Sequence, residues 1–173
     1  SQDQTTEVLN GFQSRFAQKN IRLSVMNNSE NVGFGRACNQ GIREFFKGGA
    51  QFLVVLNNDT WLMEGWDQAL VQTLIKHQLD CVGPYFYEKE LNANISQIAH
   101  SFIKHNAGKI RKHFVPILMC FTRSAAVRLA SDSAGTNGGI FDERYFVTFE
   151  DTDLLHRMKT LGMKYAQTGS CFI

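Results

Sequence analysis

The feature that most constrains the fold is the apolar run FLVVL at residues 52–56, which contains no polar side chain. A strand with one face in water alternates apolar and polar residues, whereas a parallel strand covered on both faces is apolar throughout. The run therefore predicts a buried parallel strand. Helical patterns around it give the order helix, strand, helix, strand, which is typical of an α/β sheet.

Apolar periodicity predicts further elements along the chain. Helices are expected at residues 3–19, 35–47, 66–77, 124–130 and 150–161. Strands are expected at residues 21–26, 81–87, 99–104, 113–122 and 163–168, with loops at 27–35, 88–97 and 131–139. No repeat or interdomain linker interrupts this order, so we expect one α/β domain over residues 1–173.

Composition narrows the class of protein. A chain of 173 residues with 43% hydrophobic content is long enough for one domain with a substantial core. The formal net charge is +2 and the densest basic run, Lys104 to His113, is short, so nucleic acid is not an expected partner. Four cysteines lie far apart without a C-x-x-C pair, which favours reduced thiols in a cytoplasmic protein over a zinc knuckle or a disulfide framework.

Targeting signals and membrane spans are not apparent in the sequence. No apolar stretch approaches the roughly 20 residues that cross a bilayer, and SQDQTTEV at the start resembles neither a signal peptide nor a transit peptide. We expect a cytoplasmic location, with any membrane association arising from peripheral contact at the cytoplasmic face or from missing parts of the protein.

Polar residues follow the apolar run directly, as NNDT at residues 57–60. In open α/β sheets the carboxyl end of a strand is where ligands bind, which makes Asn57, Asn58 and Asp59 candidates. Asp59 and Asn57 offer a carboxylate and an amide oxygen, an incomplete set for Mg²⁺ or Mn²⁺ that phosphate oxygens and water would complete. An Asx-turn that closes the strand explains the same residues, and taken alone it is the better explanation.

A glycine-containing loop, NVGFGRACNQG at residues 31–41, precedes a predicted helix. Gly33 and Gly35 loosen the backbone where helix-terminal amides face an anion, and Arg36 adds a positive charge. The glycine spacing is not that of a Rossmann fingerprint, and the G-K-[ST] of a P-loop is missing. Phosphate contact and an ordinary glycine loop that caps a helix are about equally supported.

An acidic segment, FDERYFVTFEDTDLLHRMKTLG, occupies residues 141–162 and places Glu150, Asp151 and Asp153 at the start of an amphipathic helix. A helix N-terminus stabilises the ionised carboxylate, whereas neighbouring acids raise the pKa of a carboxyl group. Asp151 therefore has the environment of an ionised but basic carboxylate. From this segment alone an ordinary capped helix with acids in its first turn is the better explanation.

Other kinds of site find little support. The five histidines lack metal-ligand spacing, no serine lies in a G-x-S-x-G turn, and no cysteine has an evident local base. Core packing is the better explanation for Trp66. For Trp61, which lies beside NNDT, packing and sugar stacking are about equally supported.

Three motifs in this order, N-x-G-F-x-R-A-x-N-x-G, a strand ending in N-N-D-T, and F-D-E-R-Y-F followed by E-D-T-D-L-x-x-R, resemble glycosyltransferase family 2. The resemblance covers nearly the whole chain and is strongest to the rhamnosyltransferase-like branch. It implies a GT-A fold, a three-layer α/β sandwich with a mostly parallel mixed sheet. It also implies a hexosyltransferase-type enzyme that moves a sugar, with inversion, from a nucleotide-diphosphate donor to a glycan or glycolipid hydroxyl in polysaccharide biosynthesis.

The resemblance also implies roles for individual residues. Asp59 and Asn57 match the family's D-x-D motif, which holds a divalent cation and the diphosphate, although Asn57 replaces an acid. Asp151 matches the general base, and Glu150 matches its partner near the acceptor.

Further matches concern the donor and the helix. Asn31, Gly33, Arg36 and Asn39 match the loop beside the nucleotide. Beside the N-N-D-T motif, Asn58 and Trp61 are further substrate-binding candidates. Asp153 and Arg157 resemble supports for the acidic helix and its junction.

The sequence departs from the family pattern at both ends and in the middle. The family's first strand and helix, its C-terminal part with a metal-binding histidine, and the glycine-containing turn expected in HFVPILMCFTR at 113–123 are not matched. A non-catalytic nucleotide-sugar-binding or scaffold domain is therefore the alternative function. A sugar-phosphate nucleotidyltransferase ranks below it, because no glycine-rich loop with paired basic residues is found. The donor sugar, its base and the acceptor do not follow from the sequence.

Overall fold

The structure is a computed structural model that describes residues 4–85, 94–132 and 136–172. The chain forms two compact units, Ser1–Val32 and Gly33–Ile173. The expectation of one domain over residues 1–173 stays a prediction.

The first unit contains helix α1 (Thr5–Gln18), which confirms the predicted helix. The prediction of a strand at residues 21–26 is wrong, because these residues have no regular secondary structure. A strand is stabilised by hydrogen bonds to a partner strand, and no described strand pairs with this segment.

The second unit contains a five-stranded sheet and five of the described helices. The helices are α2 (Phe34–Lys47), α3 (Trp66–His77), α4 (Ile95–Asn106), α5 (Arg123–Ser131) and α6 (Glu150–Thr160). The strands are β1 (Phe52–Leu56), β2 (Cys81–Tyr85), β3 (Ile110–Arg111), β4 (Leu118–Thr122) and β5 (Tyr165–Phe172). Helices and strands alternate through much of this unit, so the predicted α/β class is confirmed.

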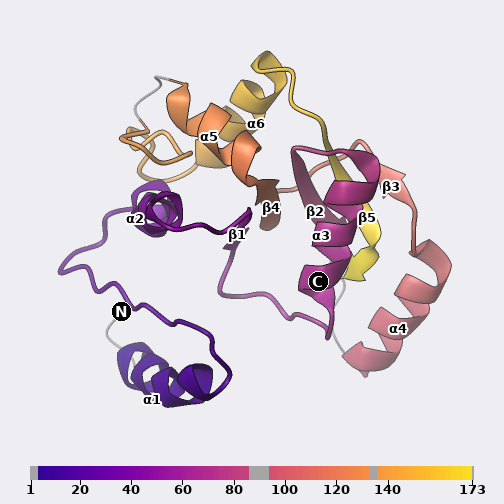
Figure 1. The fold of residues 1–173 in the computed structure, drawn as a ribbon, viewed down its shortest axis with the longest axis horizontal. Helices are drawn as coiled ribbons and strands as arrows, with labels where there is room; N and C mark the ends of the chain where they lie inside the picture. The colour runs from indigo at the N-terminus through magenta and orange to yellow at the C-terminus, as the bar shows by residue number, and fades with distance from the viewer. Residues whose placement is uncertain (1–3, 86–93, 133–135, 173) are drawn as a thin grey trace. The chain divides into compact units, whose positions relative to one another are not determined.

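The sheet has the strand order β1-β4-β2-β5-β3 (Figure 1). β4 runs antiparallel to both β1 and β2, and β3 runs antiparallel to β5. Among the described strands only β2 and β5 pair in parallel. The predicted mixed sheet is therefore confirmed, but its pairings are mostly antiparallel rather than mostly parallel.

Helices cover both faces of the sheet, as a three-layer sandwich requires. Strand β4 lies between the layers, because Met119 and Phe121 enter one apolar cluster while Leu118 and Cys120 enter the other. The first cluster includes residues of α2, α5 and α6, and the second includes residues of α3.

Strand β1 has the predicted bounds but not the predicted environment. Leu53 and Val55 are buried against the first cluster, whereas Val54 and Leu56 are 36% and 37% exposed. β1 pairs with β4 alone among the described strands and so forms an edge of the sheet. The prediction of a parallel strand covered on both faces is wrong, since only one face of β1 is covered by helices.

Three other predicted elements change. The strand expected at 99–104 is part of helix α4, whose start is capped by the Asn94 side chain accepting from Ser96 N at 3.1 Å. The strand expected at 113–122 is shortened to β4, and the preceding residues form a turn around Pro116. The strand expected at 81–87 is present as β2, while its last two residues and most of the expected loop at 88–97 lie outside the described residues.

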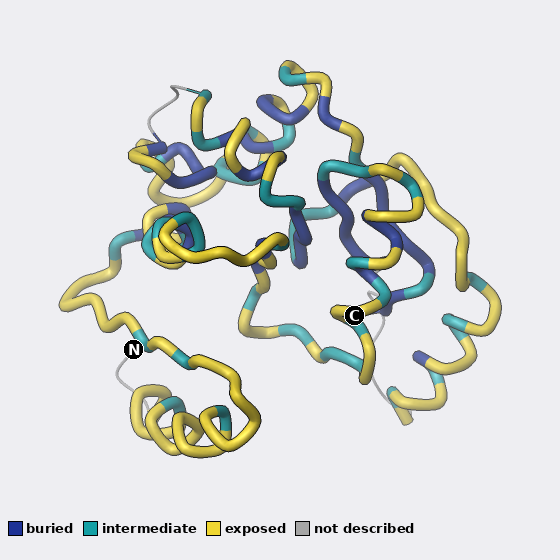
Figure 2. Tube along the Cα trace, in the orientation of Figure 1, coloured by how far each residue is buried: buried dark blue, intermediate teal, exposed yellow. Residues whose placement is uncertain are grey.

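Burial follows this architecture (Figure 2). β5 is buried along nearly its whole length, whereas α1 contributes no buried residue. The four cysteines are free thiols, and three of them are buried. Within the described residues, no helix is both long enough and apolar enough to cross a membrane.

Candidate active site

Strand β1 delivers the first candidate residues at its carboxyl end. The Asn57 N–H donates to Ile117 O at 3.2 Å, and Thr60 Oγ1 donates to Asn57 O at 2.9 Å, so the chain turns at once after the strand. Asn57 is half-buried by this turn, while Asn58 and Asp59 are exposed. The turn explanation and the ligand explanation are thus compatible, because the turn exposes the polar side chains.

Helix α6 delivers the acidic residues. Glu150 and Asp151 are half-buried in its first turn, where the positive end of the helix dipole stabilises negative charge. The N-cap residue is Phe149, and it makes no side-chain cap hydrogen bond. The acids therefore lie in the first turn, as the segment alone suggested, but the helix start lacks the side-chain cap of an ordinary capped helix.

A pocket of about 280 Å³ brings the two elements together. We call it the acid pocket; among the residues that line it are Phe34, Asn57, Ile117, Phe141, Glu150 and Asp151. These residues come from four separate parts of the sequence. Asn57 and the acid pair, which lie more than ninety residues apart, therefore share one cavity.

The two acids have different surroundings in the acid pocket. Asp151 Oδ1 accepts from Thr152 N at 2.6 Å and from Thr152 Oγ1 at 3.3 Å. Glu150 Oε2 is buried and has no hydrogen-bond partner among the described residues. Burial raises the pKa of the nearby Cys38 thiol to about 11, and the Glu150 charge adds to this rise. A buried carboxylate oxygen without a partner is costly, so this oxygen has an unused capacity to accept a hydrogen bond.

A buried arginine fixes the position of α6. Arg157 Nε donates to Asp153 Oδ2 at 2.8 Å, and its guanidinium also donates to the carbonyl oxygens of Ile140 and Leu129. Arg157 is only 5% exposed. It therefore ties α6 to α5 and to the loop before α6, which agrees with the supporting roles expected for Asp153 and Arg157.

Asn39 connects α2 to that same loop. Its Oδ1 accepts from Ile140 N and Phe141 N, both at 3.0 Å, while its Nδ2 donates to Phe141 O at 2.8 Å. Asn39 is fully buried, and a β-carbon on Gly139 would lie 2.1 Å from its side chain. In this arrangement Asn39 holds the loop in place, and its expected contact with the nucleotide stays a prediction.

The predicted glycine loop contributes close packing. Gly33 caps α2 with φ of 83°, a conformation that favours glycine, and a β-carbon there would lie 2.7 Å from Phe146 O. A β-carbon on Gly35 would lie 3.2 Å from the Phe141 β-carbon. The glycines thus let the start of α2 approach the loop before α6, and Phe34 between them lines the acid pocket.

A cluster of charged and polar side chains around Glu143 joins α2 to the loop before α6, and the sequence analysis did not predict it. Glu143 accepts from Arg43 at 3.0 Å, from Asn39 at 3.1 Å and from Asn137 at 2.8 Å. Burial opposes ionisation of Glu143, but these hydrogen bonds outweigh it and hold the pKa of Glu143 below its ordinary value. No local signal marks the cluster, because Asn39 and Arg43 on α2 lie about 100 residues from Glu143 in the sequence.

The remaining candidates are less closely joined to the acid pocket. Arg36 is exposed and its Nε donates to Glu143 O at 3.2 Å, which leaves the rest of its guanidinium at the surface. Trp61 is 40% exposed. Asn31 belongs to the first unit and is not placed against the others.

Metal-binding capacity is limited to what these residues offer. Among the described residues no group of three or more histidines, cysteines or acids is gathered. Asn57 and Asp59 supply oxygen donors, which suit Mg²⁺ or Mn²⁺, and the remaining ligands would have to come from phosphate and water.

Comparison with known proteins gives one match. A family model described as "Glycosyl transferase family 2" matches residues 1–134. None of the curated proteins and none of the solved structures compared with the chain matches it. The matched region contains β1 and the turn after it but ends before α6. The family match therefore does not cover Glu150 and Asp151.

Proposed function

The chain belongs to glycosyl transferase family 2, and from this premise we propose that it transfers a hexose, with inversion, from a nucleotide-diphosphate donor to a glycan or glycolipid hydroxyl. The observation that carries the proposal is the acid pocket, which is lined both by Asn57, directly after β1, and by Glu150 and Asp151 of α6. Inverting transfer needs a diphosphate site and a base within one cavity, because attack and departure occur on opposite faces of one carbon.

Asp151 is the proposed general base. The acceptor oxygen attacks the anomeric carbon, the bond from that carbon to the diphosphate oxygen breaks, and the hydroxyl proton passes to Asp151. The helix dipole favours negative charge at this position, and the hydrogen bonds from Thr152 orient the Asp151 carboxylate. A positioned base of this kind typically contributes about 10² to 10⁴ in rate.

Glu150 is the proposed acceptor-side residue. Its buried oxygen, which has no hydrogen-bond partner within the described ranges, would accept a hydrogen bond from an acceptor hydroxyl. Such a bond would also orient the acceptor. Phe34, Ile117 and Phe141 line the same pocket and would exclude water from it.

The donor side is proposed at the turn after β1. Family members typically use a divalent cation, and Asn57 with Asp59 would hold Mg²⁺ or Mn²⁺ together with diphosphate oxygens. When bound, the cation would neutralise charge on the departing nucleotide diphosphate. Arg36, Asn58 and Trp61 expose side chains suited to phosphate or sugar, while Gly33 admits the start of α2 to the site.

The test of the base compares two Asp→Asn substitutions at helix N-termini. Asp151→Asn should keep nucleotide binding and lower transfer by about 10² to 10⁴. Asp67→Asn makes the same change in the first turn of α3, at an exposed position outside the acid pocket, and should leave transfer unchanged. Transfer at the wild-type rate by Asp151→Asn would overturn the assignment.

Calorimetric titration separates the enzyme from the alternative. UDP, dTDP and GDP, each with and without Mn²⁺, test whether the chain binds a nucleotide diphosphate and whether the metal strengthens that binding. Binding without sugar turnover would favour the non-catalytic nucleotide-sugar-binding domain. A lack of binding to all three would favour a scaffold.

A further inference from the structure

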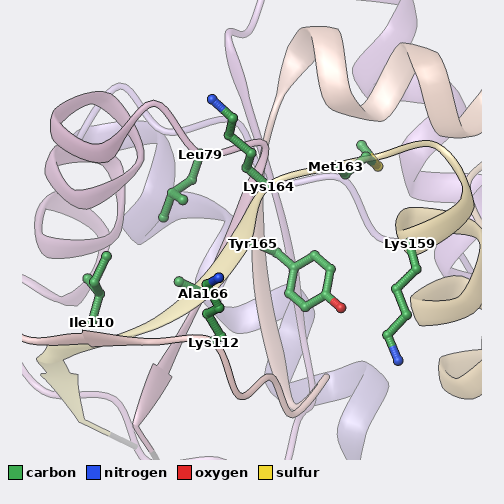
Figure 3. A pocket seen from close by; sticks show the side chains of 8 residues that line it. All are labelled: Leu79, Ile110, Lys112, Lys159, Met163, Lys164, Tyr165 and Ala166. Atoms are coloured by element: carbon green, nitrogen blue, oxygen red, sulfur yellow. The ribbon is translucent and has the colours of Figure 1, made fainter.

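A second pocket, of about 620 Å³, lies at the other end of helix α6 (Figure 3). We call it the lysine pocket, because Lys112, Lys159 and Lys164 line it. The eleven residues of α6 span roughly 16 Å at about 1.5 Å per residue, and they separate the lysine pocket from the acids of the first turn. The lysine pocket is therefore not part of the proposed active site.

The pocket forms where β3 diverges from β5. β3 pairs Ile110 with Thr168 and Arg111 with Gln167, and the pairing stops there. The next residues of β5, Tyr165 and Ala166, pair with β2 on one side and line the pocket. The short β3 therefore leaves part of the sheet edge open beneath the lysines.

The positive charge of the pocket is not neutralised within the described protein. Lys112, Lys159 and Lys164 are all exposed, and none forms an ion pair with a described carboxylate. Asp80, beside the pocket, is bound by Arg128 at 3.3 Å and accepts from the Lys164 backbone N–H at 2.8 Å. Its carboxylate is thus engaged away from the lysine ammonium groups.

Apolar side chains lie among the three cations. Leu79 and Met163 line the pocket, and Ile110 at its rim is 41% exposed. The Tyr165 ring is half-buried and packs edge-on against Phe114, with ring centroids 5.6 Å apart. The ligand that fits this surface has anionic groups together with an apolar part.

The arrangement of the cations distinguishes among anionic ligands. Figure 3 shows the three ammonium groups at separate points around Tyr165 rather than directed at one point. One phosphate is best bound by donors that converge on it, whereas separated charges match an extended array of anions. Single-stranded nucleic acid would call for open aromatic faces for stacking. Among the described residues that line the pocket, Tyr165 is the one aromatic residue, and its ring is packed against Phe114.

We propose that the lysine pocket is a docking surface for anionic phospholipid headgroups, with Ile110 in contact with the acyl boundary. A bilayer surface presents many phosphates in one plane above an apolar layer, which matches lysines spaced around apolar side chains. The proposal goes beyond the proposed function and does not depend on it, since no residue of the acid pocket takes part.

Sedimentation with vesicles tests the proposal. The protein should bind vesicles of phosphatidylcholine and phosphatidylglycerol but not vesicles of phosphatidylcholine alone, and binding should weaken as salt is added. Replacing Lys112, Lys159 and Lys164 together by glutamine should weaken binding about 100-fold, because each lysine near an anionic bilayer contributes roughly a fivefold factor.

A matched variant controls for net charge. Lys47, Lys76 and Lys104 are exposed lysines outside the pocket, and their replacement by glutamine removes the same charge. This control should bind anionic vesicles as the wild type does. Equal weakening by both variants, or no weakening by the pocket variant, would overturn the proposal.

Two further arms exclude other sources of the same chemistry. Pocket-dependent binding of inorganic phosphate without binding to vesicles would overturn the membrane proposal in favour of a soluble phosphate, and pocket-dependent binding of a short single-stranded oligonucleotide without binding to vesicles would overturn it in favour of nucleic acid. Nucleotide titration of the pocket variant should match the wild type. Failure of this proposal is thereby distinguishable from failure of the proposed transferase.

Discussion

The two ends of helix α6 carry opposite charges but are built differently. Glu150 and Asp151 stand in its first turn, and Lys159 stands in its last, so both ends complement the helix dipole. The acids are half-buried against segments that are distant in sequence, whereas Lys159 is exposed. The charge pattern is thus the same kind of signal at both ends, and burial decides which end resembles an active site and which a surface.

The backbone has a positive φ beside both ends of α6, but only one of the two residues is a glycine. Phe149 before α6 has φ of 67°, and Gly162 after α6 has φ of 62°. Glycine adopts this left-handed conformation without strain, whereas a bulky residue is strained by it. Thr148 beside Phe149 also has a positive φ, so strain is confined to the acidic end. Strain of this kind persists where the surrounding structure holds it, as it does next to the proposed base.

The largest expected effect on stability comes from breaking the anchor of the acidic end. Arg157→Met would leave Asp153 and the Ile140 carbonyl without their buried partner, at a cost of about 3–5 kcal/mol in the free energy of unfolding. Lys159→Met on the same helix removes an exposed cation and should cost within about 0.5 kcal/mol. Urea denaturation of both variants measures the difference, and equal costs would show that Arg157 is not an anchor.

The second effect concerns the loop that leads to α6. Gly139→Ala should destabilise the protein by about 1–3 kcal/mol, since the new methyl group would overlap the Asn39 side chain. Gly41→Ala in α2 has open space around it and should stabilise by roughly 0.5–1 kcal/mol. Thermal denaturation should give a lower melting temperature than the wild type for Gly139→Ala and a higher one for Gly41→Ala.

A double substitution checks the cause of the Gly139 effect. Asn39→Gly removes the whole side chain, including the β-carbon that would lie 2.6 Å from the new methyl, so Gly139→Ala should add little further cost in that background. If the two costs add fully, overlap with the Asn39 side chain is not the cause of the destabilisation by Gly139→Ala.

The sequence predicted local elements better than distant contacts. Helices α2 and α3 and strand β1 begin and end within one residue of their predicted bounds, because each has strong periodicity or an unbroken apolar run. The sequence analysis predicts a strand at 99–104 where the structure has helix α4, although Ile95, Ile98, Ala99 and Phe102 have helical spacing. The cap at Asn94 was the signal that could have corrected it.

The candidate site was predictable only in part. Asn57, Glu150 and Asp151 were all singled out from motifs, and the structure brings them to one pocket. The contact of Asn39 with Phe141 spans 102 residues and joins two buried groups, so no local pattern announces it. The prediction that β1 is covered on both faces is wrong for a similar reason, because an apolar run does not specify which strands or helices pack against it.

Strain at the acidic end gives an expected effect of about 1 kcal/mol. Phe149→Gly should raise the free energy of unfolding by roughly that amount, because glycine relieves the positive φ and the lost side chain is 65% exposed. Gly162→Ala at the other end imposes the strain that Phe149 already bears and should lower stability by a similar amount. Chemical denaturation tests the pair, and a destabilised Phe149→Gly would mean that this ring packs more than its exposure suggests.

The smallest effect is the pH dependence of the loop before α6, which contains Asp142 and Glu143. Hydrogen bonds from Arg144 hold the pKa of the buried Asp142 below its ordinary value, and Glu143 is lowered by its three donors. Such groups bind more protons when unfolded, so their stabilisation is complete above the ordinary values of 3.8 and 4.5 and is lost as the pH falls through the lower folded values.

Hydrogen exchange at decreasing pH locates this loss. Amides at residues 136–143 should lose protection as the carboxyls protonate, while amides at 161–166 beside the lysine pocket should keep theirs. Glu143→Gln keeps the shape of the side chain but not its titration, so it should flatten the pH dependence of the loop. An unchanged pH dependence in this variant would assign the acid response to Asp142, whose partner Arg144 lies on the same loop and not on α2.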